Sequence, residues 1–254
     1  MINEFTLERL DIPGGWIRGE GDWAGVAAAM KRGETVEVIQ EVGSTLWKTT
    51  LPEGHSLSWN GDNLSTIKAR IWISFTQRRF SPESALPKVQ WHPRVLWVGI
   101  GCEGGTSREL IETAITQVCH AYDLASSAIA GIATIDTKAN EAGIIELCQG
   151  RNWPLKTFAA NILNSVEVPN PSNIVAQKVG TSSVAEAAAL CAVREEFLTA
   201  DECRLTQISI NHLRSSALIC GSNPLLVPKK IFRSGEKPGS VTVAVAVCAI
   251  EYLG

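Results

Sequence analysis

The sequence RVLWVGIGCEGGTS, residues 94–107, decides how the chain is expected to fold. Its apolar run Val95–Val98 is typical of a buried strand, and the glycines that follow predict a tight turn. Apolar residues then recur at helical spacing, and Thr106 or Ser107 can cap the start of that helix. The stretch therefore predicts a strand, a glycine turn and a helix. The apolar positions of the helix are Leu110, Ile111, Ala114, Ile115, Val118 and Cys119.

The glycine turn permits two interpretations as a binding site. Gly99, Gly101 and Gly104 have the G-x-G-x-x-G spacing of a dinucleotide-binding turn between a strand and a helix. That fingerprint also expects an acidic residue at the end of the next strand, whereas Asp123 precedes that strand and Asp136 lies further along than the fingerprint expects. The interpretation of the chain as a nicotinamide-dependent oxidoreductase thus rests on the glycine spacing alone. The more general interpretation is an anion site, because helix N-termini attract negative charge.

Strands and helices alternate from Val95 onward, which predicts an α/β fold, a layered sheet with flanking helices. The segment 194–214 is more polar than its neighbours and has no assigned structure. The expected strands are 95–98, 129–135 and 155–158, the expected helices are 107–122, 141–149, 160–165, 172–176 and 184–193, and 223–232 with 241–247 are expected to close the domain as a hairpin.

The part of the chain before residue 94 differs in composition, because seven of the eight tryptophans lie at or before Trp97. We therefore expect a smaller α/β segment at residues 1–93, ahead of a domain at residues 94–254. In the segment, periodicity predicts a helix at 22–31, strands at 35–41 and 70–75, a turn at 61–63 and, from its prolines, a linker at 77–91.

Composition excludes several classes of protein. The 254 residues are 45% hydrophobic and 19% charged, which is typical of a globular protein with an ample core. A net charge of −3 does not indicate a nucleic-acid or membrane partner. No apolar run approaches the roughly 18 residues of a membrane span, and no secretory signal is evident, so a cytoplasmic location is expected. The seven cysteines lack zinc-site spacing, which indicates free thiols and no bound metal.

Four motifs along the chain resemble the C-terminal domain of the CbiG family of cobalamin biosynthesis, which has CobE as a stand-alone relative. The resemblance covers Arg94–Val247. The family's middle segment is similar, more faintly, to residues 33–38, 51–54 and 73–74, and its N-terminal domain has no counterpart in the sequence. The motifs are Gly99–Cys102 with Gly105–Ser107, Ala133–Glu141, Pro169–Ser172 and Val179–Ala189, followed by a fitting Leu225–Lys230.

The resemblance implies a cobalt-precorrin-5A hydrolase, which opens a δ-lactone on a cobalt-bearing corrinoid and releases acetaldehyde. It implies no cofactor, since the substrate carries the cobalt. The implied partners are the corrinoid intermediate, a separate N-terminal domain or other enzymes of the pathway. A non-catalytic protein that holds the intermediate, or one subunit of a split hydrolase, is the alternative.

The tryptophans are interpreted as core and domain interface, with a tetrapyrrole-stacking surface as the alternative.

Such a reaction needs a base to activate water, a donor for the oxyanion and positive groups for carboxylates. Asp136 or Glu141 could be the base, because they follow the second strand at the edge where open α/β sheets bind ligands. Thr134 shares a strand face with Asp136, and Lys138 can anchor a carboxylate. The alternative is that Asp136 caps the next helix and Lys138 is solvated.

The glycine turn supplies the other groups of this hypothesis. Backbone N–H groups from Gly101 to Ser107, with the hydroxyls of Thr106 and Ser107, could bind a substrate carboxylate or the lactone oxygen. A plain helix cap is the alternative. Glu103 departs from the family, which carries basic residues after the cysteine, and an acid there would repel a carboxylate. Cys102 would be a nucleophile only beside a basic partner, and packing is its other role.

A second helix start, at Thr181, Ser182 and Ser183, is a further candidate for binding an anion, and Glu186 lies one turn into that helix. The alternative is a capping box, whose spacing Ser183 and Glu186 match. We expect these three segments to form one substrate-binding edge.

Overall fold

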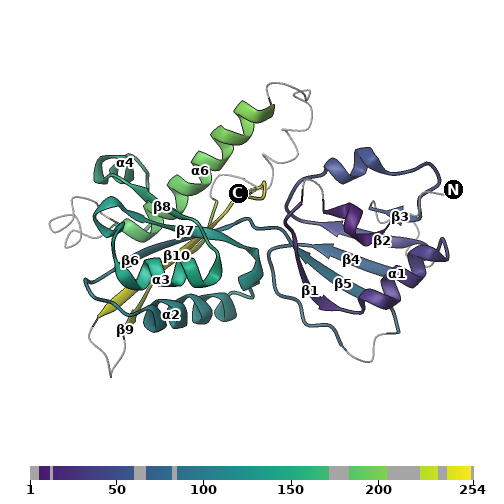
Figure 1. Cartoon of the computed structure of the whole chain (residues 1–254), viewed down its shortest axis with the longest axis horizontal. Coiled ribbons are helices and arrows are strands. Elements are labelled where there is room, and N and C mark those ends of the chain that lie inside the picture. Colours follow the sequence, from purple (N-terminus) through teal and green to yellow (C-terminus); the bar gives the residue numbers. More distant parts are fainter. Residues whose placement is uncertain are drawn as a thin grey trace. The chain divides into compact units, whose positions relative to one another are not determined.

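The computed structural model describes residues 6–11, 14–59, 67–81, 85–171, 183–204, 224–233 and 239–252 (Figure 1). The chain divides into two compact units. The first comprises Met1–Arg94 with Ile250–Gly254, and the second comprises Val95–Ala249. The end of the chain from Ile250 thus groups with the first unit. No helix in the described part is both long and apolar enough to cross a membrane.

A mixed five-stranded sheet, in the order β1-β5-β4-β2-β3, forms the first unit. The strands β2, β3, β4 and β5 run parallel, and β1 pairs antiparallel with β5. Helix α1 packs against the sheet and begins at Asp22, whose carboxylate accepts from the Gly25 N–H at 2.8 Å. The elements are η1 (Leu7–Leu10), β1 (Ile17–Gly21), α1 (Trp23–Lys31), β2 (Val36–Gln40), η2 (Leu46–Thr50), β3 (Leu57–Ser58), β4 (Ala69–Ile73) and β5 (Lys88–His92).

The core of the first unit contains several of the tryptophans, as expected. Trp16, Trp47 and Trp91 are buried, and Trp16 meets Trp91 edge to face at 6.4 Å between ring centroids. The linker predicted at 77–91 is wrong over its last four residues, Lys88–Trp91, because they belong to the strand β5 between β1 and β4. Its side chains from Val89 onward are buried, so the two prolines ahead of it do not prevent pairing.

The second unit is a layered α/β structure, as predicted, around the sheet β8-β7-β6-β10-β9. The strands β6, β7 and β8 are parallel, and β9 and β10 form an antiparallel hairpin against β6. Helices α2 and α3 pack on each other on one side, and α6 crosses the other side (Figure 1). The elements are β6 (Leu96–Cys102), α2 (Arg108–Ala121), η4 (Ser126–Ala128), β7 (Ile129–Ile135), η5 (Asp136–Lys138), α3 (Ala142–Arg151), β8 (Leu155–Phe158), α4 (Ala160–Asn164), α6 (Val184–Arg204), β9 (Leu225–Arg233) and β10 (Ser240–Val247).

The helix α6 is longer than predicted. It continues through Val193 to Arg204, so the first part of the polar segment 194–214 is helical and the rest lies outside the described residues. The predicted turn at 61–63 and the predicted helix at 172–176 also lie outside them. The helix α6 approaches the sheet closely at Gly99, which has no side chain. A Cβ on Gly99 would stand only 1.8 Å from the Ala185 carbonyl oxygen.

Candidate functional site

The glycine turn lies at the carboxyl end of β6, between Cys102 and the start of α2. Gly105 has a φ of +75°, a left-handed conformation that glycine adopts without strain. The buried Thr106 hydroxyl donates to the Glu103 carbonyl oxygen at 2.8 Å. The Ser107 hydroxyl accepts from the Leu110 N–H at 3.3 Å and so caps the helix. Both hydroxyls therefore take part in shaping the turn.

An acidic side chain of the protein itself lies against this turn. Glu141 accepts from the Gly105 N–H at 2.6 Å and from the Lys138 ammonium group at 2.8 Å. These contacts join the turn after β6 to the segment after β7, as the sequence predicts for neighbouring parallel strands. The bond from Lys138, together with backbone N–H bonds, holds the pKa of the Glu141 carboxyl below its ordinary value despite some burial. The Glu141 carboxylate already accepts hydrogen bonds from two groups that stabilise its charged form. It therefore binds a proton weakly and is a weak base.

We expect Glu141→Gln to lower the free energy of unfolding of the second unit by about 1–2 kcal/mol at neutral pH, because hydrogen bonds to a charged group contribute more than neutral ones. The folded-state pKa lies below the ordinary 4.5, so this stabilisation is present above that pH and is lost as the pH falls through the folded-state pKa. Urea titrations of both proteins near pH 7 and near pH 3 measure the difference.

The matched control for this test is Glu146→Gln, which removes an exposed carboxylate from the same helix, α3. It should leave the unfolding free energy nearly unchanged at both pH values. A stability difference for Glu141→Gln that stays the same at low pH would contradict the proposed role of its charge.

Thr134 and Asp136, predicted to share a face, have different surroundings. Thr134 is fully buried, and its hydroxyl donates to the Ile100 carbonyl oxygen at 2.7 Å, which ties β7 to β6. Asp136 is exposed in the 3-10 turn η5, where its carboxylate accepts from the Thr137 N–H at 2.7 Å. The N-cap of α3 is Glu141, so Asp136 does not cap that helix. Its carboxylate remains accessible to water.

The Cys102 thiol lies at the end of β6, partly exposed, close to the pair formed by Lys138 and Glu141. Burial raises the pKa of this thiol to about 11, and Glu141 adds to the increase while Lys138 opposes it. The thiolate is the reactive form of cysteine. Cys102 is therefore protonated at neutral pH, which favours the packing role over the nucleophilic one.

We expect Cys102 to react slowly with iodoacetamide in the folded protein. With a pKa of about 11, only about one thiol in a thousand is ionised at pH 8. Mass spectrometry of the peptide that contains Cys102 should show little alkylation under conditions that label free glutathione fully. The denatured chain is the control and should be labelled at the ordinary rate. Rapid labelling of the folded chain at pH 8 would show that the thiol is activated.

The start of α6 is organised around a buried acid. Glu186 is fully buried and accepts from the Ser183 hydroxyl at 2.9 Å, the Asn170 amide at 2.9 Å and the Lys229 N–H at 3.1 Å. Ser183 therefore donates to the Glu186 side chain, which joins α6 to β9 and to the loop at Asn170. The other two residues of this predicted segment, Thr181 and Ser182, lie outside the described residues.

The first two predicted segments meet at the end of β6, and the described start of α6 lies nearby. The glycine turn contacts Glu141, and a Cβ on Gly101 would stand 3.6 Å from the Val184 Cβ at the start of α6. The sequence did not reveal that Lys229 and Asn170 meet Glu186, and the only available signal was an acid one turn into the otherwise apolar predicted helix 184–193. Among the residues that the structure describes, no group of three or more acidic, histidine or cysteine side chains is arranged to hold a metal ion.

Both parts of the chain match family models of cobalamin synthesis. A family model described as "Cobalamin synthesis G C-terminus" matches residues 96–246, and one described as "Cobalamin biosynthesis central region" matches residues 11–93. Together they account for most of the chain.

Two curated proteins, both called cobalt-precorrin-5A hydrolase, are similar to the chain. The protein of Priestia megaterium is 27% identical over 174 residues, which cover 65% of this chain and 46% of that protein. The protein of Salmonella typhimurium (strain LT2) is 32% identical over 127 residues, which cover 50% of this chain and 36% of that protein. The matched part of the chain therefore spans less than half the length of these relatives.

The crystal structure of CobE, "a protein from the cobalamin (vitamin B12) biosynthetic pathway", is also similar. It is 25% identical, with a TM-score of 0.45, and the match covers 62% of this chain and 93% of that chain.

Proposed function

The chain belongs to the cobalamin synthesis G family, and on that premise we propose that it acts in corrin-ring synthesis as a cobalt-precorrin-5A hydrolase. The observation that carries the proposal is the match of two family models to consecutive stretches, residues 11–93 and 96–246. The names of the two curated relatives supply the substrate and the reaction.

The proposed reaction begins when water adds to the lactone carbonyl carbon of the substrate. A base removes a proton from the water, and donors stabilise the negative charge on the carbonyl oxygen. Cleavage of the C–O bond yields a carboxylate and a hydroxyl group. Deprotonation of that hydroxyl then releases acetaldehyde, as the C–C bond breaks and its electron pair stays with the ring. The cobalt belongs to the substrate.

We assign the base to Asp136. Its carboxylate is exposed at the sheet edge where parallel strands end, the edge at which α/β proteins bind ligands. Glu141 instead positions Lys138 and the glycine turn. Lys138, which keeps 20% of its side chain exposed, supplies positive charge for a substrate carboxylate. The Gly105 and Thr137 N–H groups are already engaged by the Glu141 and Asp136 carboxylates.

A second function, binding of the intermediate without hydrolysis or as one subunit of a split hydrolase, is favoured by one observation. Within the described part of the site, Glu141 is already paired and Cys102 is protonated, so Asp136 is the single predicted reactive group that remains available. A site with one exposed acid is better equipped for binding than for two successive bond cleavages.

Incubation of the purified chain with cobalt-precorrin-5A separates the two functions. Acetaldehyde is trapped as a hydrazone and quantified, while the corrinoid absorption spectrum is followed in the same sample. Stoichiometric acetaldehyde from the chain alone is the result expected for the hydrolase. A spectral shift without acetaldehyde would support the binding function, and neither signal would overturn both.

A further inference from the structure

Glu103 is the first residue after the strand β6 and begins the glycine turn. Its backbone is held on both sides, because its N–H donates to the Ser240 carbonyl oxygen at 3.2 Å and its carbonyl oxygen accepts from the Thr106 hydroxyl at 2.8 Å. Its side chain is exposed and makes no hydrogen bond or ion pair with a residue that the structure describes. Glu103 thus places a free carboxylate at the end of β6.

This carboxylate shares an edge of the sheet with Asp136. The parallel strands β6 and β7 pair with Gly99 opposite Ala133, so Glu103 and Asp136 follow that pair by four and three residues. Neighbouring strands lie about 4.8 Å apart, and at physiological ionic strength exposed charges act over about 8 Å. The two carboxylates therefore influence the same region, beside the ends of β6 and β7.

The turn beyond Glu103 leaves room for a ligand in this region. Beyond its chain neighbours, a Cβ on Gly105 would meet no atom within 4 Å, and a Cβ on Gly104 would find only the Lys138 ammonium nitrogen, at 3.9 Å. The two glycines, which have no side chains, keep this space open. Because Glu141 already accepts from the Gly105 N–H, the turn has little to offer a second carboxylate.

The charges around this open space are mostly negative. The segments 102–107 and 134–141, which the structure describes completely, carry three acids, Glu103, Asp136 and Glu141, and one basic side chain, Lys138. Glu141 pairs with Lys138 at 2.8 Å, so most of that positive charge is balanced. The exposed carboxylates of Glu103 and Asp136 form no ion pair with a described residue. A negative group brought to the turn is therefore repelled.

We propose that Glu103 determines which side of the substrate enters the site, because it repels the carboxylates of the ring and admits the neutral lactone. This inference rests on the proposed function, which supplies a ring that carries both groups. With the lactone over the glycine turn, its carbonyl carbon lies within reach of water activated by Asp136. Glu103 exchanges no proton in the reaction. It acts as a specificity-determining residue by excluding the wrong orientation, a common use of an unpaired charge.

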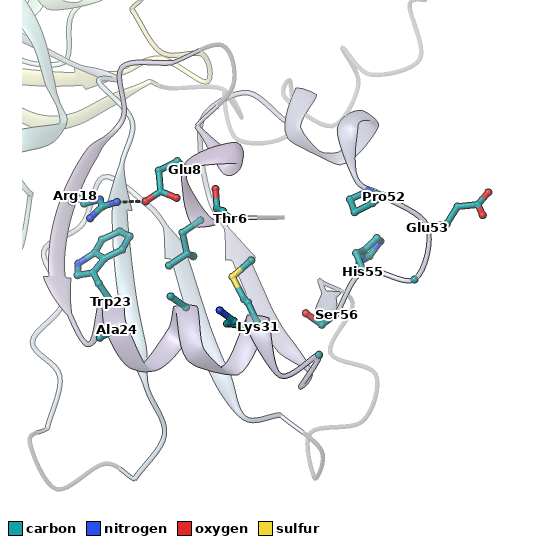
Figure 2. A pocket seen from close by; sticks show the side chains of 15 residues that line it. Thr6, Glu8, Arg18, Trp23, Ala24, Lys31, Pro52, Glu53, His55 and Ser56 are labelled. Atoms are coloured by element: carbon teal, nitrogen blue, oxygen red, sulfur yellow. Dashed lines mark hydrogen bonds and ion pairs between the residues drawn. The ribbon is translucent and has the colours of Figure 1, made fainter. Parts of the chain in front are cut away.

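The first unit should contribute little to this selection by charge. Its cavity of about 670 Å³ is lined by two side chains of fixed positive charge, Arg18 and Lys31 (Figure 2). Arg18 pairs with Glu8, and Lys31 has an interaction of its own. Neither cation is thus free to distinguish a carboxylate from a neutral group. A binding difference between charged and neutral rings that depends on Glu103 is therefore assigned to the glycine turn.

Isothermal titration calorimetry of the full chain with two stable corrinoids measures the repulsion. Cobyrinic acid carries carboxylates around its ring, cobinamide carries amides in their place, and both are used as dicyano forms so that the cobalt ligands are the same. At low salt, Glu103→Gln should lower the dissociation constant of cobyrinic acid about three- to tenfold, and Glu103→Lys about ten- to thirtyfold. The dissociation constant of cobinamide should change less than about twofold, since its side chains are uncharged.

Salt separates this electrostatic role from a structural one. In about 0.5 M sodium chloride the gains for cobyrinic acid should largely disappear, because salt screens exposed charges. A change in the shape of the turn would instead affect both corrinoids and would persist in salt. Glu146→Gln is the matched control, because it removes another exposed carboxylate of the second unit and changes the net charge equally. It should leave the binding of both corrinoids unchanged.

Turnover of cobalt-precorrin-5A tests the orientation itself. Glu103→Lys should lower kcat and KM together by about tenfold, because the variant holds most of the substrate by a carboxylate, in an orientation that does not react. If Glu103→Lys binds cobyrinic acid no more tightly than the natural chain, or gains equally for both corrinoids, the inference is overturned, and continued acetaldehyde release leaves the hydrolase intact. A salt-sensitive gain for cobyrinic acid, in a chain that releases no acetaldehyde, keeps the selection against carboxylates and removes the hydrolase.

Discussion

Gly99→Ala is expected to destabilise the second unit by about 3 kcal/mol or more, at the upper end of the cost of overpacking. The added Cβ would stand 1.8 Å from the Ala185 carbonyl oxygen and 2.9 Å from the Ala189 backbone nitrogen. Both are backbone atoms of α6, so no side-chain rotation relieves the clash. The helix must move away from β6, which opens the packing between α6 and the centre of the sheet.

Gly101→Ala is the matched control, two residues further along the same face of β6. Its Cβ would find Val184 Cβ as the nearest atom at 3.6 Å, an ordinary contact, and should change stability by less than about 0.5 kcal/mol. Hydrogen exchange of β6 and β7 peptides, followed by mass spectrometry, reports the second unit separately from the first. Equal protection in the two variants would contradict the close approach of α6.

The same glycines show what the sequence could and could not predict. Their spacing predicted a turn between a strand and a helix; the turn is confirmed at Gly104 and Gly105, whereas Gly99 and Gly101 lie within the strand β6, which is longer than predicted. The spacing did not reveal that Gly99 is required by α6, because the partner, Ala185, lies far along the chain. Close backbone approach and phosphate binding both call for glycine, so a glycine pattern alone cannot distinguish between them.

Secondary structure was predicted best where apolar periodicity is strong. The helix α2 and the strand β7 begin and end within one residue of the prediction, since the buried positions of α2 follow the helical period and β7 is a continuous buried apolar run. The strand β1 was missed because it contains two glycines, and β5 was mistaken for a linker because of nearby prolines. Both strands are held by pairing with each other, which sequence periodicity does not encode.

Sheet geometry predicted that two of the candidate segments meet. Segments after the parallel strands β6 and β7 must meet at one edge, and the contact between Gly105 and Glu141 confirms that they do. Sheet geometry does not predict the direction in which individual side chains point. The Thr134 hydroxyl bonds to the neighbouring strand, and Glu141 turns toward the glycine N–H. Both outcomes depend on partners that only the folded chain brings near.

Asp136→Asn is expected to reduce acetaldehyde release from cobalt-precorrin-5A by about 100-fold or more, the usual effect of losing a general base. Asparagine keeps the shape of the side chain and can still accept from the Thr137 N–H, so η5 should be retained. The amide cannot remove a proton from water, and the loss should therefore appear in kcat. Single-turnover assays at saturating substrate measure the step.

Two further variants distinguish loss of the base from loss of the contacts that position Lys138 and the glycine turn. Glu146→Gln, which removes an exposed carboxylate elsewhere in the same unit, should leave the rate unchanged. Glu141→Gln should raise KM more than it lowers kcat, because it releases Lys138 and the glycine turn rather than removing the base. A larger loss of kcat for Glu141→Gln than for Asp136→Asn would transfer the role of base to Glu141. The pairing of Glu141 with Lys138 and Gly105 argues against that result, since a carboxylate stabilised by two donors has little affinity for a proton.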